Sequence, residues 1–235
     1  MSDYREELET ERTMKDRFMA HHVESPFVQE RVHDFSGLRY FAVDPDFRVP
    51  ARLERRPVPE EAYLRTNKDG QAVMRYLGDL TFALSGRSLR LRVYHAGEGV
   101  GTSMFVPFRD ATSGDESYGP GRYLTLEMNE KDEYEVDFNQ AFNPYCAYTD
   151  AFECPFPPAE NDLPVAVRAG EQVWSPSRNP RTPSSAVLDL IPGRRARAQA
   201  TSRAGNPSTP APKPAARPRR AIARPAASRT KRVRR

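Results

Sequence analysis

The stretch that decides the fold is residues 104–161, MFVPFRDATSGDESYGPGRYLTLEMNEKDEYEVDFNQAFNPYCAYTDAFECPFPPAEN. Within it, apolar residues alternate with polar residues over 123–128 and again over 133–138. A period of two is typical of strands that bury one face. We expect a hairpin with a turn at 130–132 and the following cross-strand pairs on the core face: Met128 with Tyr134, Leu126 with Val136, and Leu124 with Phe138.

Two irregular segments flank this predicted hairpin. Residues 112–121 hold three glycines and a proline, which indicates a connecting loop. A phosphate cradle is the alternative, but Asp110, Asp115 and Glu116 lie beside the loop and no Walker lysine follows it. Residues 143–161 are rich in proline and aromatic residues, which favours an extended strap lying against an apolar surface.

A second hairpin is predicted around Ser85-Gly86-Arg87-Ser88. A two-residue turn with Gly86 first places six apolar residues on one face. The predicted pairs are Leu84 with Leu89, Phe82 with Leu91, and Leu80 with Val93.

These patterns together predict a mainly β fold. Short strands follow one another from about 38 to 172 with frequent turns, which favours an antiparallel β barrel or sandwich without distinguishing the two. Residues 2–20 have an apolar stripe at helical spacing, and Ser25-Pro26 is typical of the start of a second, short helix. We therefore expect one or two N-terminal helices within residues 1–36 and a β domain over 37–175.

Three runs of sequence resemble a known family. They are FSGLRYFAVDPDFRVPARL, FVPFRDATSGDESYGPGRYLTLEM and DFNQAFNPYCAYTDAFECPFPPAENDLPVAVRAGE. They resemble the bacterial and archaeal family catalogued as domain of unknown function 1684, over residues of about 12 to 173. The resemblance implies no chemistry, because the family is named for the absence of a known function.

The charge of the chain divides sharply near Trp174. Residues 176–235 hold 14 Arg and 2 Lys against the single acid Asp189, whereas residues 1–175 hold 20 basic and 31 acidic residues. Ten prolines and the lack of aromatic residues predict a disordered tail over 176–235. Nucleic acid is one candidate partner, through Arg217, Arg219, Arg220, Arg224, Arg229, Lys231, Arg232, Arg234 and Arg235. Neutral drift and folding back on the acidic domain are the alternatives.

The N-terminus is too charged for a signal peptide, and no run reaches the roughly 20 apolar residues of a membrane span. This predicts a cytoplasmic protein.

Cys146 and Cys154 match neither the spacing of a metal knuckle nor that of a C-x-x-C pair, which favours structural thiols or a disulfide. No histidine lies in the motif to activate Cys146 as a nucleophile. No metal or cofactor is expected.

Polar residues of the motif are candidates to line a pocket for a small polar ligand. They are Asp110, Tyr118, Arg122, Tyr123, Asn139, Asn143, Tyr145, Glu160 and Asn161. Under the structural alternative, the asparagines satisfy turn backbones and Arg122 pairs with a carboxylate.

Three functions follow in order of preference. The first is a β domain that binds a small polar ligand. The second is a nucleic-acid-associated protein that acts through its tail. The third is a hydrolase-like or lyase-like enzyme in which Asp110 and Glu160 act as acid and base. Whether the chain is an enzyme stays open at this point.

Overall fold

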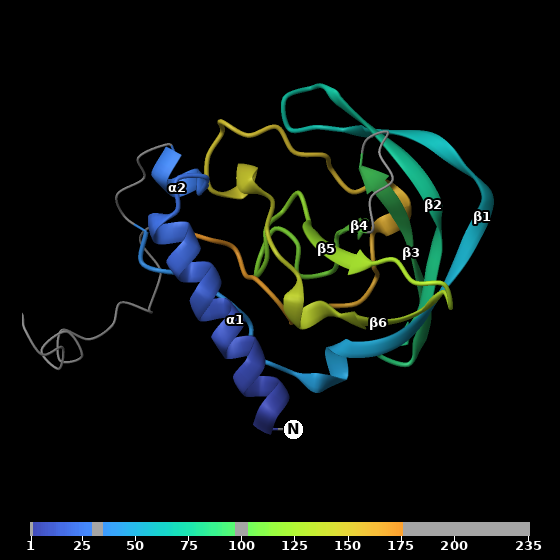
Figure 1. The fold of residues 1–235 in the computed structure, drawn as a ribbon, viewed down its shortest axis with the longest axis horizontal. Helices are drawn as coiled ribbons and strands as arrows, with labels where there is room; N and C mark the ends of the chain where they lie inside the picture. Colours follow the sequence, from blue (N-terminus) through green and yellow to red (C-terminus); the bar gives the residue numbers. More distant parts are fainter. Residues whose placement is uncertain (1, 30–34, 97–102, 176–235) are drawn as a thin grey trace, which may run out of the picture. The chain divides into compact units, whose positions relative to one another are not determined.

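The computed structural model describes residues 2–29, 35–96 and 103–175. The basic tail, with the nine candidate nucleic-acid contacts, lies outside them, and the division of the chain into three segments stays a prediction. Six antiparallel strands form one sheet with the order β5-β4-β3-β2-β1-β6 (Figure 1). The strands are β1 (Arg48–Arg65), β2 (Gln71–Leu84), β3 (Arg87–Ala96), β4 (Ser103–Phe108), β5 (Arg122–Glu127) and β6 (Glu133–Asp137).

The sheet curves into a nearly closed barrel, which confirms the mainly β fold and selects the barrel over the sandwich. β5 and β6 are its two edges, so the predicted pairing of 124–128 with 134–138 is wrong. β5 pairs with β4 instead, and β6 pairs with β1. The chain after β6 returns to β5, where Tyr123 and Phe142 exchange two backbone hydrogen bonds.

The β2–β3 hairpin forms as predicted but with a different register. The turn is Ser85-Gly86, with φ angles of 52° and 71°, and Leu84 therefore pairs with Arg87. A turn with two positive φ values matches the twist of the flanking strands, and glycine suits its second position. The observed register differs from the predicted one by two residues, which leaves every side chain on its predicted face.

The barrel interior is filled by alternating apolar residues from all six strands. Among the most deeply buried of these residues, with 0% of their area exposed, are Leu80, Leu91, Val93, Met104 and Val106. The segment after the strands joins this core, and its contribution is Leu163, Val165, Val167 and Ala169. This segment is also hydrogen-bonded to residues 39–41, because Phe41 N donates to Gly170 O and Gln172 N donates to Arg39 O.

Helix α1 (Ser2–His21) lies along the outside of the barrel, and α2 (Pro26–Gln29) follows it (Figure 1). Both confirm the predicted N-terminal helices. Ser25 Oγ accepts a hydrogen bond from Phe27 N, as expected of a helix cap. Met19 packs with Phe27, Leu38 and Tyr148 in a second apolar cluster. Among the described residues, no helix is long and apolar enough to cross a membrane.

Four short 3-10 helices complete the described chain: η1 (Pro45–Phe47), η2 (Phe138–Gln140), η3 (Tyr145–Ala147) and η4 (Ala159–Asn161). The last two lie in the segment predicted as a strap. That segment is tied to the far end of the β1–β2 hairpin, since Phe156 N donates to Arg65 O at 2.6 Å and Asn67 N donates to Cys154 O at 3.2 Å.

Candidate functional site

A buried ion pair stands at the centre of the motif. Arg122, the first residue of β5, donates from Nη2 to Asp110 Oδ2 at 2.8 Å, and both side chains are fully enclosed. Asp110 also accepts backbone hydrogen bonds from Thr112 and Val167. The carboxylate partner expected for Arg122 under the structural alternative is thus present.

The same guanidinium holds the C-terminal segment on the barrel. It donates to the carbonyl oxygens of Val167 (2.8 Å), Ala169 and Glu171 (3.1 Å). Burial lowers the pKa of Arg122, and the charge of Asp110 opposes that change. Arg122 therefore joins two parts of the chain that lie 45 or more residues apart.

The three predicted asparagines are buried and bound to backbone groups. Asn161 accepts from Arg92 N at 2.7 Å and donates to Arg92 O and Pro107 O. Asn139 bridges to the backbone of residue 44, and Asn143 donates to Gln172 O at 2.8 Å. Each side chain thus links its own segment to the backbone of another, and its role toward a ligand stays a prediction.

Tyr118, Tyr123 and Glu160 each interact with a protein group, and Tyr145 has an aromatic neighbour. Tyr123 donates to Pro155 O at 2.6 Å, and Tyr118 donates to Cys146 O at 3.3 Å. Burial raises the pKa of both phenols. Tyr145 packs edge-on against Phe152. Glu160 lies near the surface and pairs with Arg92 at 3.0 Å.

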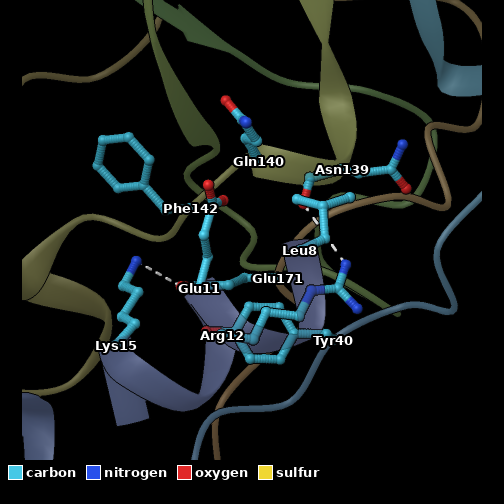
Figure 2. A pocket seen from close by; sticks show the side chains of 9 residues that line it. All are labelled: Leu8, Glu11, Arg12, Lys15, Tyr40, Asn139, Gln140, Phe142 and Glu171. Carbon is cyan, nitrogen blue, oxygen red and sulfur yellow. Dashed lines mark hydrogen bonds and ion pairs between the residues drawn. The ribbon is translucent and has the colours of Figure 1, made fainter. Parts of the chain in front are cut away.

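One cavity lies between α1 and the barrel, and we call it the α1 cavity (Figure 2). Its volume is about 250 Å³, and its lining is Leu8, Glu11, Arg12, Lys15, Tyr40, Asn139, Gln140, Phe142 and Glu171. Lys15 Nζ lies 2.6 Å from Glu171 Oε1 across it. The other carboxylate oxygen of Glu171 accepts from Tyr148 Oη and Asn143 N. Two of the charged groups on its walls, Lys15 and Glu171, are therefore paired with each other.

A larger cavity lies between the end of β1 and the strap, and we call it the strap cavity. Its volume is about 530 Å³, and its lining is Tyr63, Leu64, Arg65, Arg109, Pro120, Phe156, Pro157, Pro158 and Ala159. Gly121 lies behind it with φ +120°, where a Cβ would stand 2.7 Å from Pro157 Cγ and 3.0 Å from Arg109 Cγ. Only glycine fits there without moving the wall of the cavity.

Sequence reasoning found the segment of the strap cavity but missed its two arginines. Asn139 lines the α1 cavity, whereas none of the nine predicted residues lines the strap cavity in the part of the chain that the structure describes. Arg109 stands directly before Asp110 in the motif, which is the one signal that could have pointed to it. Arg65 ends a strand far away in sequence, and no local pattern connects it with the strap.

The comparisons with known proteins agree with the resemblance noted in the sequence. The family model described as a protein of unknown function, DUF1684, matches residues 33–172. The chain belongs to the DUF1684 family. This DUF1684 chain is also similar to an uncharacterized protein from Haloarcula marismortui, gene locus rrnAC0354, solved by solution NMR. The two are 41% identical, the match covers 73% of this chain and 95% of the other, and the TM-score is 0.58. No curated protein matches this chain.

The two cavities differ in how much of their lining lies within the residues that the family model matches. The whole lining of the strap cavity lies inside residues 33–172, whereas four of the residues that line the α1 cavity belong to α1 and lie outside. Of these two cavities, the strap cavity is therefore the one whose lining lies entirely within the DUF1684 part of the chain.

Proposed function

We propose that the β domain binds a small anionic molecule in the strap cavity. The observation that supports this is the pair of guanidinium groups, Arg65 and Arg109, in a lining that contains no acid. Arg109 has a loose ion pair with Asp162 at 3.9 Å, and among the described residues no carboxylate lies within ion-pair distance of Arg65. Two cationic groups without an acid beside them are unusual in this part of the chain, because residues 1–175 carry eleven more acidic than basic residues.

The lining also indicates the chemical class of the ligand. Arginine forks bind carboxylate and phosphate groups through paired hydrogen bonds. Tyr63, Phe156 and the prolines offer flat and apolar surfaces for the rest of the molecule. A volume of about 530 Å³ is within the usual range of small-molecule pockets. We therefore expect a compact organic carboxylate or phosphate ester with a flat or apolar body.

The geometry favours binding over the enzyme alternative. Asp110 is enclosed and paired with Arg122, and Glu160 pairs with Arg92 near the surface. The two carboxylates thus have separate cation partners and share no cavity among those described above. The nucleic-acid alternative depends on the tail and remains a separate proposal.

The proposal is tested on the full chain with phenyl phosphate as the probe, by isothermal titration and by the shift in melting temperature. We expect saturable binding that weakens about 10-fold or more in Arg65→Gln and again in Arg109→Gln, since a hydrogen bond to a charged group contributes about 1.5–3 kcal/mol. Native mass spectrometry of gently purified chain should show any ligand carried over, and Arg65→Gln should lose it.

The matched control is Arg90→Gln, because Arg90 is an exposed arginine on β3 and is absent from the lining of the strap cavity. It should bind phenyl phosphate as the unaltered chain does. Equal loss in the control, or undiminished binding in both lining variants, contradicts the proposal. Inorganic phosphate and neutral benzamide separate the contributions of charge and of the aromatic walls.

A further inference from the structure

The α1 cavity leads to a carboxylate that the barrel encloses. Glu171 has 1% of its area exposed, and its backbone is fixed because Glu171 N donates to Ala141 O at 2.8 Å. Its Oε2 atom accepts from Asn143 N at 2.8 Å and from Tyr148 Oη at 2.7 Å. Burial and the charge of Glu171 raise the pKa of the Tyr148 phenol, which therefore keeps the proton that it donates. The barrel thus holds one carboxylate oxygen of Glu171, and the other, Oε1, is left for a partner from outside the barrel.

Lys15 of α1 is that partner. Its ammonium nitrogen lies 2.6 Å from Glu171 Oε1 and 4.9 Å from the centre of the Phe142 ring (Figure 2). A carboxylate beside an aromatic face suits organic ammonium groups, because the negative charge and the ring quadrupole both attract the cation. Glu171 and Phe142 therefore hold an ammonium group, and in this structure that group is the side chain of Lys15.

The attachment of α1 to the barrel does not depend on Lys15 alone. Arg12 Nη1 donates to Phe41 O at 3.1 Å, and Leu8 and Met19 are buried with 3% and 1% of their area exposed. The Lys15 side chain itself is 31% exposed, and side chains with access to solvent change rotamer readily. Lys15 can therefore turn out to solvent while these contacts keep the helix in place.

The cavity beside Lys15 has room for a small molecule. Its volume of about 250 Å³ is just below the range of about 300–1,000 Å³ for pockets that hold drug-sized ligands. Leu8 and Phe142 offer apolar surface for a short alkyl chain, and the exposed residues Glu11 and Gln140 add polar groups. Within residues 2–29, 35–96 and 103–175, no three His, Cys, Asp or Glu side chains gather as ligands for a metal ion. The lining thus favours an organic ammonium ion over a metal ion.

We propose that Glu171 and Phe142 form a binding site for a small primary alkylamine, which enters the α1 cavity as its ammonium ion and displaces the side chain of Lys15. The site is separate from the strap cavity and does not rest on the function proposed there. Lys15 competes from within the same chain, so it lowers the apparent affinity for a free amine. The enclosed carboxylate has a cation partner in both states, which avoids the cost of an unpaired buried charge.

The test uses the full chain, titrated near neutral pH with propylammonium chloride at constant ionic strength and followed by NMR of the nitrogen-labelled protein. The reporter is the backbone amide of Asn143, which donates to Glu171. We expect a saturable shift of its signal in Lys15→Ala, with a dissociation constant about tenfold or more below that of the unaltered chain, because the competing ammonium group is gone. Neutral n-propanol, which is similar in size, should leave the signal in place.

Two variants separate this site from general effects on α1. Arg17→Ala removes an exposed cation of α1 that lines neither cavity, so it should bind propylammonium as the unaltered chain does. Adding Glu171→Gln to Lys15→Ala should abolish the shift, although the amide oxygen can still accept from Asn143 and Tyr148.

Equal affinity in Lys15→Ala and in the unaltered chain overturns the proposal, as does binding that survives Glu171→Gln. If Lys15→Ala fails to fold alone, propylammonium should restore its folded spectrum, because it replaces the missing cation beside the enclosed carboxylate. A spectrum that n-propanol restores equally well, or that neither compound restores, also overturns it.

Discussion

Replacing Arg122 by methionine is the most informative perturbation of the fold. Methionine keeps the unbranched apolar stem, but it removes the donors to Asp110 and to the carbonyl groups of residues 167, 169 and 171. Removing one partner of a buried ion pair costs about 3–5 kcal/mol, because an unpaired charge stays behind. We expect the free energy of unfolding to fall by about 4 kcal/mol or more, which is a large share of the about 5–15 kcal/mol of an ordinary domain.

The assay is urea unfolding followed by the fluorescence of Trp174, the single tryptophan of the chain. Its ring packs 5.0 Å from Phe27 and reports on the segment that Arg122 holds. Arg168→Met is the matched control, because Arg168 pairs with Glu116 at the surface and such pairs contribute about 1 kcal/mol at most.

The double variant Arg122→Met/Asp110→Asn tests the reasoning itself. If the cost comes mainly from an unpaired buried charge, the neutral amide should restore about 1–2 kcal/mol relative to Arg122→Met alone. A double variant less stable than the single one refutes this account. A loss of under about 1 kcal/mol in Arg122→Met refutes the claim that this guanidinium holds the C-terminal segment.

Three further predictions concern other parts of the chain. Gly121→Ala should lower the stability by about 1–3 kcal/mol in thermal unfolding, since its Cβ would collide with Pro157 at a positive φ, and an unchanged melting temperature contradicts this. Asn161→Ala should cost about 2–3 kcal/mol in urea, because it removes the side-chain partner of the buried Pro107 carbonyl and of the part-buried backbone of Arg92, and a smaller loss means that water replaces the amide. Replacing the nine named basic residues within 217–235 by glutamine in the full chain should weaken binding to duplex DNA and flatten its dependence on salt, whereas equal slopes contradict a role for these nine residues.

The faces of the strands could be predicted from the sequence, but their partners could not. Alternation placed Val136 and Leu124 in the core, where the structure has them. The alternation carries no information about which strands pair with each other. β5 and β6 are adjacent in the sequence, yet they lie at opposite edges of the sheet. For the hairpin at Ser85-Gly86, registers two residues apart bury the same side chains, so the pattern could not separate them.

The candidate site shows the same limit. The sequence marked Arg122 and the asparagines as unusual, yet their partners are backbone groups of distant segments such as Val167 and Gln172. Arg65 reaches the strap cavity because the end of β1 is hydrogen-bonded to the strap, a contact across about ninety residues of chain. Contacts between residues so far apart in the chain depend on the complete barrel fold, and no local sequence pattern indicates them.

The contribution of residues 163–172 to the barrel core has a consequence for protein synthesis. The barrel interior includes Leu163, Val165, Val167 and Ala169, and Arg122 finds its carbonyl partners only there. On a ribosome, the domain cannot complete its fold until these residues have left the exit tunnel. The sixty residues of 176–235 are translated afterwards, which takes about 3–12 s at roughly 5–20 residues per second. Their translation moves residues 163–172 out of the tunnel, so the domain can complete its fold while the chain is still being made.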